Sequence, residues 1–174
     1  GKATTFMGLA GAMVPAGMGG IVSDLIDRGY VDILVSTGAN LVHDMVEAIG
    51  CRHYHGSADC SDNDLRKKGI NRIYDVYVSD DAFTQFEEFI QGVFGGLREG
   101  TAISTSELLG MVGKKLPSGI LATAARKGVP VYCPAVQDSV FGLQFSLFTQ
   151  NHHVVVDAFR DMKGFLDRCF TAER

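Results

Sequence analysis

Hydrophobic positions follow two different spacings over the first fifty residues. A short apolar run starts at Thr5 and passes into a turn of small residues. From about Met18, apolar residues recur at i, i+1, i+4 and i+5, which predicts a helix that Arg28-Gly29 ends. A continuous apolar run at 31–37 then precedes a second helical pattern at 41–49. This strand–helix–strand–helix order is typical of a parallel sheet with crossover helices.

The rest of the chain is less regular but predicts further elements of both kinds. Residues 51–69 are polar and irregular. No internal repeat, low-complexity tract or linker interrupts the sequence, which predicts a single α/β domain over residues 1–174. Beyond residue 69 we expect a strand at 73–78, a helix at 82–94 capped by Asp80 or Asp81, a helix capped by Ser104 or Thr105, a helix from Pro117 to Lys127 that Gly128 ends, a buried strand at 129–136, a strand or helix from 154–156, and a closing helix that reaches Phe170.

Composition and charge narrow the classes of protein that remain. The 174 residues are 46% hydrophobic and 21% charged, with a net charge of -4. That length is enough for a packed core, and the lack of a basic stripe argues against a nucleic-acid surface. No apolar run approaches the ~20 residues that cross a bilayer, and residues 1–5 lack a signal-peptide pattern. Because the four cysteines are irregularly spaced, we expect reduced thiols in a cytoplasmic protein without membrane or nucleic-acid partners.

Loops of small residues follow the first two predicted strands, at residues 8–17 and 36–40. In open parallel sheets, ligands bind outside the carboxyl ends of the strands, near helix N-termini that favour phosphate. Asp138 follows the strand at 129–136 in the same way. Its carboxylate could accept from a ribose hydroxyl or a cationic amine, or form only an Asx turn or a helix cap. Because the G-x-G-x-x-G fingerprint is missing, nucleotide binding and tight strand–helix packing both remain open.

Histidines and cysteines supply the other candidate chemistry. His43 and Glu47 are four residues apart on the second predicted helix and therefore share a face. Near the mouth of a nucleotide cleft His43 would be a proton-transfer group, and elsewhere it would be a solvated side chain. A second group invites comparison with zinc sites: Cys51, His53, His55 and Cys60. Its spacing matches few of the usual zinc ligand pairs, so we predict no metal site.

Five stretches of the chain together resemble the deoxyhypusine synthase family. They occur in the family's order and spacing and extend over nearly the whole chain. One stretch alone would be a weak signal, whereas five in register are a strong one. The stretches are TFMG at 5–8, GAMVPAG at 11–17, VDILVSTGAN at 31–40, KGINRI at 68–73 and VPVYCPAVQD at 129–138.

The resemblance implies a three-layer Rossmann-like parallel sheet with helices on both faces, of a type also seen in sirtuins. It implies an NAD-dependent transferase of polyamine chemistry. In this family spermidine is oxidised, and its butylamine fragment passes through a lysine imine to a lysine of the translation initiation factor 5A precursor, in a homotetramer with shared active sites. By position, the NAD contacts would come from Gly11, Ala12, Met13, Val14 and Pro15, from Ser36, Thr37, Gly38 and Ala39, and from Asp138 near the ribose.

The chain departs from the family pattern where the amine substrate is held. Val42 and His43 stand where the familiar enzymes carry two adjacent acidic residues, and Leu143 stands where an Asp holds an amine of spermidine. An apolar residue cannot stabilise an ammonium, which costs several kcal/mol when buried unpaired. We therefore expect His43 to bind the substrate and leave the amine open, because related enzymes of this fold use putrescine or agmatine, and homospermidine chemistry is another alternative.

The lysine that forms the imine in this family has no counterpart here. Family chains are about twice as long, and that lysine lies in a later segment after a Gly-rich strand. The lysines that fail to match its motif are Lys114, Lys115, Lys127 and Lys163. We assign no catalytic residue and expect the chain to be part of a longer family chain, one half of a split protein, or an incomplete paralogue that needs a lysine-bearing partner.

Overall fold

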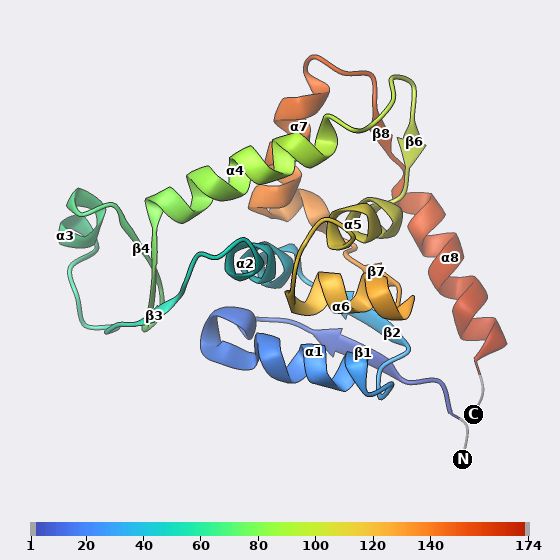
Figure 1. Ribbon diagram of the computed structural model, residues 1–174, viewed down its shortest axis with the longest axis horizontal. Coiled ribbons are helices and arrows are strands. Elements are labelled where there is room, and N and C mark those ends of the chain that lie inside the picture. Colours follow the sequence, from blue (N-terminus) through green and yellow to red (C-terminus); the bar gives the residue numbers. More distant parts are fainter. Residues whose placement is uncertain (1–2, 173–174) are drawn as a thin grey trace.

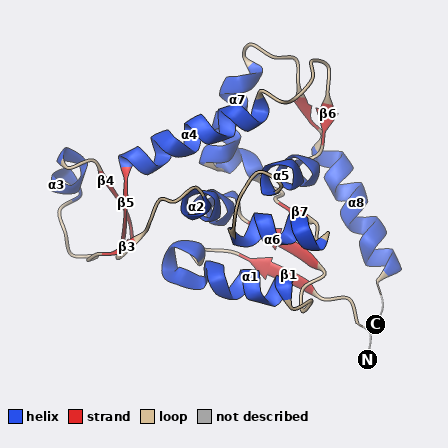
Figure 2. Ribbon diagram, viewed as in Figure 1, coloured by secondary structure: helices blue, strands red, loops and turns tan. Residues whose placement is uncertain are grey.

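A three-stranded parallel sheet lies at the centre of the computed structural model, which describes residues 3–172. The strands are β1 (Phe6–Leu9), β2 (Ile33–Ser36) and β7 (Val131–Tyr132), in the order β1-β2-β7 (Figure 2). Leu34 pairs with Val131 and has no exposed surface. A buried central strand of this kind explains why residues 31–37 read as a continuous apolar run. The predicted α/β class with parallel strands is confirmed.

Helices contribute most of the remaining structure (Figure 1). Phe94 packs edge-on against Phe141 and Phe145, with ring centroids 5.4 and 5.1 Å apart. Among the described residues, no helix is both long and apolar enough to cross a membrane. The longer helices are α1 (Gly19–Asp27), α2 (Gly38–Ala48), α4 (Asp80–Phe94), α5 (Thr105–Gly113), α6 (Gly119–Lys127), α7 (Val140–Thr149) and α8 (Ala158–Thr171).

The two faces of the sheet meet different partners. Leu34 and Val131 belong to the main hydrophobic core, which also includes residues of α1, α2 and α6. The opposite face meets α8, where the Phe165 ring lies 5.7 Å from that of Phe6 and 5.4 Å from that of Tyr132. A second parallel pair, β6 (Ala102–Ile103) with β8 (Val155–Val156), immediately precedes α5 and α8. Residues 154–156 thus give a strand.

An antiparallel sheet projects from the body of the molecule, and the sequence did not predict it (Figure 1). The expected single strand at 73–78 is wrong, because the chain turns at Tyr74, which has a φ of +57°. The turn consists of Tyr74 and Asp75. It contains no glycine or asparagine, the residues that most often adopt a positive φ, so the sequence did not indicate it clearly. The expected irregular segment 51–69 also contains two ordered elements, β3 (Tyr54–His55) and α3 (Asp62–Lys67). The strands β4 (Ile70–Ile73) and β5 (Val76–Ser79) follow it and complete the antiparallel sheet.

The caps and first residues of α4, α5 and α6 can be compared with those that the sequence predicted. Ser79, rather than Asp80 or Asp81, caps α4, because its Oγ accepts from Ala82 N at 3.3 Å. Ser104 caps α5 in a reciprocal capping box with Glu107, as one of the two expected alternatives. The helix expected from Pro117 begins at Gly119 instead.

The strand expected at 129–136 is shorter than the sequence indicated. Only Val131 and Tyr132 pair in the sheet as β7. Pro130 and Pro134 flank them, and a proline has no N–H to donate to a neighbouring strand. The chain after Tyr132 is therefore free to form a loop at the sheet edge.

A buried carboxylate on α2 fixes the position of α6. Both Asp44 oxygens accept backbone hydrogen bonds from the first turn of α6, from Ile120 N at 2.7 Å and Leu121 N at 3.0 Å. Asp44 is 3% exposed, and this burial raises its pKa to about 6 even though the two N–H donors lower it. Because Ser118, which precedes α6, makes no side-chain cap, the carboxylate of Asp44 acts as the cap of this helix.

Replacing this cap should weaken the whole fold. Asp44→Ala leaves two buried N–H groups without an acceptor, so we expect the free energy of unfolding to fall by about 1 to 3 kcal/mol. Urea denaturation followed by far-UV circular dichroism measures this. Asp24→Ala is the control, because Asp24 forms only an exposed pair with Arg28 and should change stability by less than about 0.5 kcal/mol. Equal losses in both variants would contradict the role of Asp44.

Candidate functional site

Three loops leave the parallel sheet at the same edge. Because β1, β2 and β7 are mutually parallel, the segments that follow them begin side by side. These segments are residues 10–18, the start of α2 at Thr37–Gly38, and residues 133–139. They contain every residue for which the sequence predicts an NAD contact except Ser36, the last residue of β2, and Ala39, the second residue of α2.

The first loop exposes its backbone at one end and is anchored at the other. Gly11 has a φ of +69°, which favours glycine, and residues 11–13 are exposed. Val14 and Pro15 are buried at the start of the π-helical turn Val14–Met18. Val14 N donates to Asn40 Oδ1 at 3.0 Å. The exposed stretch is open to a ligand, whereas Val14 and Pro15 hold the loop in place.

The second loop presents the N-terminus of a helix. Thr37 precedes α2, but its Oγ1 accepts from Asn40 Nδ2 at 3.0 Å and not from the first-turn N–H groups. Gly38 and Ala39 therefore begin α2 with backbone donors that its own cap does not satisfy. Ser36 is buried, and its Oγ donates to Thr37 O at 3.1 Å. Uncapped donors at a helix start suit a phosphate group.

The third loop closes against the second. A Cβ on Gly38 would collide with the Ser139 side chain, so glycine is required for the two loops to approach. Ser139 is itself fixed, because its Oγ donates to Val136 O at 2.6 Å and accepts from Gly142 N at the start of α7. Asp138 ends the short 3-10 turn Val136–Asp138 and is exposed. Its carboxylate is available to a ligand beside the α2 N-terminus.

The site contains residues that the sequence did not single out. Asn40 bonds both the first loop and Thr37, and Ser139 sets the separation of the second and third loops. Asn40 stands at the end of a predicted loop, which was the one available signal. Ser139 carried no signal, because its role depends on a glycine about a hundred positions earlier in the sequence.

His43 lies on the second turn of α2, buried next to α4. Its ring is 6.2 Å from the Phe83 ring, and its Nδ1 lies 2.8 Å from Nε2 of His53. His53 Nδ1 in turn lies 2.7 Å from Glu47 Oε1. Burial, and then the charge of His53, lower the pKa of His43 to about 4, although Glu47 acts in the opposite direction. His43 is therefore neutral at physiological pH.

Within the group that resembles a zinc site, Cys51, His53 and Cys60 each have a different partner. His53 is engaged by His43 and Glu47, Cys51 donates to Gln85, and Cys60 donates to Ser57 O. Within residues 3–172 the structure assembles no group of three or more His, Cys, Asp or Glu side chains suited to a metal ion. The zinc-like spacing of these residues in the sequence therefore does not bring them together as one site within residues 3–172.

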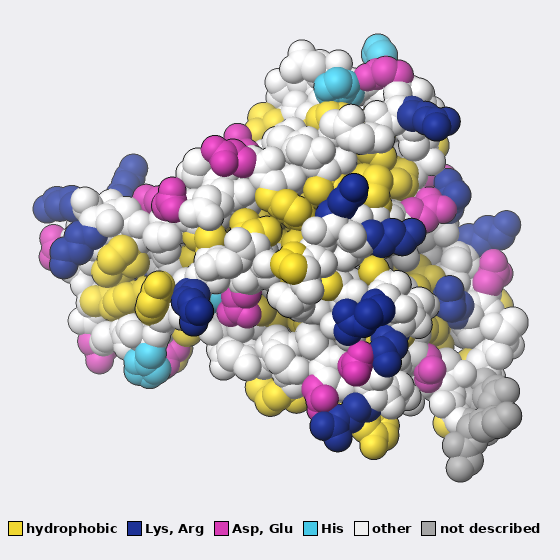
Figure 3. Space-filling view, in the orientation of Figure 1, with side chains coloured by type: hydrophobic (Ala, Val, Ile, Leu, Met, Phe, Trp, Pro, Cys, Tyr) yellow, Lys and Arg dark blue, Asp and Glu magenta, His cyan; other side chains and the backbone are white. Residues whose placement is uncertain are grey.

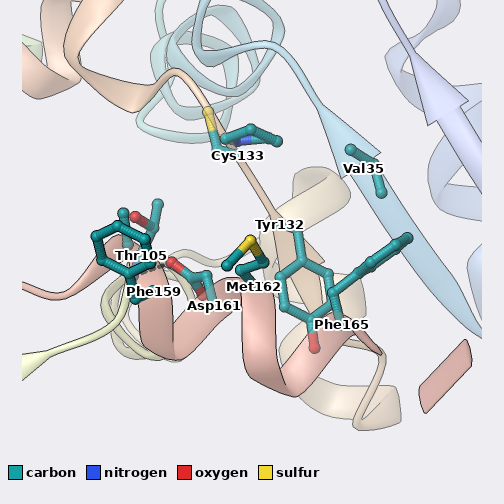
Figure 4. A pocket seen from close by; sticks show the side chains of 10 residues that line it. Val35, Thr105, Tyr132, Cys133, Phe159, Asp161, Met162 and Phe165 are labelled. Atoms are coloured by element: carbon teal, nitrogen blue, oxygen red, sulfur yellow. Dashed lines mark hydrogen bonds between the residues drawn. The ribbon is translucent and has the colours of Figure 1, made fainter. Parts of the chain in front are cut away.

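A cavity of about 370 Å³ lies on the other face of the sheet, under α8 (Figure 4). Apolar side chains from the sheet and α8 line most of it, including Val35, Tyr132, Met162 and Phe165. Its carboxylate, Asp161, already accepts from Thr105 N at 2.6 Å and Ser106 N at 2.9 Å. The lining contains none of the predicted NAD residues, all of which lie in the described part of the chain. This cavity does not favour a cationic amine.

One face of the molecule shows, among its described residues, no basic stripe that would bind a polyanion (Figure 3). In the view of Figure 3, Lys and Arg side chains are interspersed with Asp and Glu rather than gathered into one stripe. Arg126 and Lys127, for example, both lie 3.2 Å from the Asp27 carboxylate. Paired cations of this kind are poorly suited to neutralising a run of phosphates.

Comparisons with known proteins agree on one family. The family model described as deoxyhypusine synthase matches residues 1–174. The chain is 55% identical to "Probable deoxyhypusine synthase 1" of Methanosarcina mazei, over 99% of this chain and 55% of that one. It is 43% identical to the protein of the same name from Archaeoglobus fulgidus, over 95% of this chain and 54% of that one. The chain thus spans about half the length of these relatives.

A solved structure shows the same fold. The crystal structure of a deoxyhypusine synthase-like protein from Entamoeba histolytica superposes with a TM-score of 0.72. The likeness covers 95% of this chain and 53% of that chain, at 17% sequence identity. At this identity the comparison supports the fold alone.

The contact between the second and third loops yields a direct test. Gly38→Ala places a methyl group against Ser139, so we expect a loss of about 1 to 3 kcal/mol in the free energy of unfolding. Gly20→Ala is the matched control, because the space beside Gly20 is open and alanine favours a helix. The control should be neutral or slightly stabilising in the same urea titration. A neutral Gly38→Ala would mean that the loops are not in close contact.

Proposed function

The chain belongs to the deoxyhypusine synthase family, and from this membership we propose that it is the NAD-binding part of an aminobutyl transferase. Membership implies a transferase, and the proposal adds the cofactor, donor and acceptor. The donor is spermidine or a related polyamine, and the acceptor is a lysine of the translation initiation factor 5A precursor. The strands and helices then form the first part of a three-layer Rossmann-like fold, in a cytoplasmic enzyme.

One observation carries the proposal of NAD binding. The three strand-end loops meet at one edge, where α2 offers donors that its cap leaves free and Gly38 keeps the loops close. These features fit a pyrophosphate at the α2 N-terminus, with the exposed backbone of residues 11–13 beside it. Asp138 is exposed at the same edge and would accept from a ribose hydroxyl. NAD would supply a hydride acceptor for oxidation of the amine.

The amine subsite differs from that of the familiar enzymes. Val42 is buried at 2% exposure, and Leu143 is 56% exposed on α7, so neither supplies a carboxylate for an ammonium group. His43, kept neutral by its low pKa, would contact the amine by accepting a hydrogen bond, without the negative charge that a carboxylate would offer to an ammonium group. Putrescine- or agmatine-type amines and homospermidine chemistry therefore remain part of the proposal.

Turnover needs a lysine that the matching motifs do not provide. We propose that this lysine belongs to the remaining length of a family chain or to a second chain, in a homotetramer or a mixed assembly. The alternative is an incomplete subunit that activates a lysine-bearing partner. The departures at Val42 and Leu143 motivate this alternative, which the comparisons do not favour over the family activity.

NAD binding is the first test. Isothermal titration calorimetry of the protein should detect NAD, and Asp138→Ala should weaken binding about 10-fold through the loss of a charge-assisted hydrogen bond. Asp59→Ala, in the exposed loop before α3, is the control and should bind NAD as tightly as the unaltered protein. Absence of NAD binding, or equal loss in both variants, would contradict the proposed site.

Amine chemistry is tested separately by NADH absorbance. We expect NADH to form when NAD is combined with one amine from a panel of spermidine, putrescine and agmatine, because oxidation precedes transfer to a lysine. Activity that appears only after a lysine-bearing chain is added would favour the incomplete subunit. If the protein binds NAD but forms no NADH with or without the added chain, it is a nucleotide-binding domain with another function.

A further inference from the structure

Three side chains form a continuous hydrogen-bonded row beside the first strand-end loop. His43 and Glu47 come from α2, and His53 comes from the segment between α2 and β3. The His43–His53 and His53–Glu47 contacts measure 2.8 and 2.7 Å, and the two imidazole rings meet edge-on at 4.8 Å. The His53 side chain is 5% exposed, whereas that of Glu47 is 41% exposed. The row therefore joins a buried imidazole to a carboxylate that reaches solvent.

The carboxylate at one end determines the direction of each hydrogen bond. An ionised Glu47 can only accept, so Nδ1 of His53 must donate to it. When His53 is neutral, its Nε2 accepts, and Nδ1 of His43 must then donate. This leaves Nε2 of His43 as a bare acceptor. A proton arriving there would move the Nδ1 proton onto His53, where the positive charge lies against Glu47.

The unbonded end of the row lies on the stripe of α2 that begins beside the first loop. Asn40, His43 and Glu47 share this stripe at i, i+3 and i+7 spacing. At its start Asn40 accepts from Val14 N in the first loop, and at its end Glu47 Oε2 lies 3.6 Å from where a Cβ on Gly19, the first residue of α1, would be. His43 as a residue is 9% exposed, but its unbonded Nε2 is not among the described side-chain atoms that are fully buried without a partner. This nitrogen is therefore not completely enclosed by the protein.

We infer that His43, His53 and Glu47 form a proton relay that deprotonates an amine substrate at this edge of the sheet. The inference rests on the proposed function and goes further by assigning the base. An alkylammonium must lose a proton before a hydride can leave its neighbouring carbon. The N–H bond breaks, its electron pair stays on the amine nitrogen, and Nε2 of His43 takes the proton. Nδ1 of His43 releases its proton to His53, and the cation pairs with Glu47.

The groups around His43 favour passing a positive charge on to His53 over holding it on the His43 ring. Its low pKa means that the ring does not hold a proton itself at neutral pH. The charged or titratable groups that act on it are His53 and Glu47, whereas α4 presents the uncharged Phe83. Asp44, the next residue, faces α6 instead. His53 beside Glu47 is thus the place in the row where a positive charge is best stabilised.

Nitrogen-15 NMR of histidine-labelled protein tests the row without any need for turnover. We expect His43 to carry its proton on Nδ1 at neutral pH, with Nε2 bare. On acidification, His43 should switch to the Nε2–H form with Nδ1 accepting rather than hold both protons, because burial and then the charge of His53 lower its pKa. A His43 already protonated on Nε2 at neutral pH, or one that charges before His53, would overturn the relay. Neither result depends on NAD or on an amine.

Amine-dependent NADH formation, in the assembly that supports it, tests the role of the row in chemistry. Glu47→Gln keeps an acceptor for His53 but removes the charge, so we expect the rate to fall about 10-fold to 100-fold. Because the His53 cation is then less stable, the acid limb of the pH–rate profile should move to lower pH. NAD affinity and thermal stability should stay unchanged. Glu88→Gln, exposed on α4, is the control.

A purely structural row would give a different pattern. Glu47→Gln would then leave the pH profile in place, and any loss of rate would accompany a loss of thermal stability. That result would overturn the relay while leaving NAD binding, and so the proposed function, intact. Failure of the unaltered protein to bind NAD or oxidise any amine would count against the proposed function, whereas the NMR result would still decide the tautomers of the row.

Discussion

Helix α2 is buried on almost every side, and its polar side chains must therefore find partners within the protein. Each partner lies on a different element. Asn40 binds the first loop, Asp44 binds the start of α6, and His43 reaches His53 next to the antiparallel sheet. One helix thus ties together the loops, the helical layer and the projecting sheet. Because an unpaired buried polar group costs about 1 to 3 kcal/mol, these contacts also define the fold's single arrangement.

The same helix explains why ligand chemistry would concentrate at one edge of the sheet. Its first turn retains free backbone donors, since Thr37 bonds Asn40 rather than capping the helix. The start of α6, by contrast, donates its Ile120 and Leu121 N–H groups to Asp44. Two helix N-termini in one core therefore serve opposite purposes. One is closed by a buried carboxylate, and the other remains available to an anion.

The family assignment and the departures from the family pattern fit together in physical terms. Val42 faces the interior at a position where an acidic side chain would be costly unless paired, and the adjacent His43 is engaged by His53. Under the proposed function, this segment would offer an amine an imidazole in place of carboxylates, and the partners of that imidazole lie within the chain.

The sequence by itself determined the parallel α/β core, the loops after β1 and β2, and the family. These depend on local periodicity and short motifs, which the residues carry without reference to distant parts of the chain. Only the tertiary structure decided that Ser139 meets Gly38, that Asp44 caps α6 and that His53 joins His43 to Glu47. It also resolved the turn at Tyr74 and Asp75, which contains neither glycine nor asparagine. Such pairings arise because burial forces polar groups from separate segments to satisfy one another, and no spacing along the chain records that requirement.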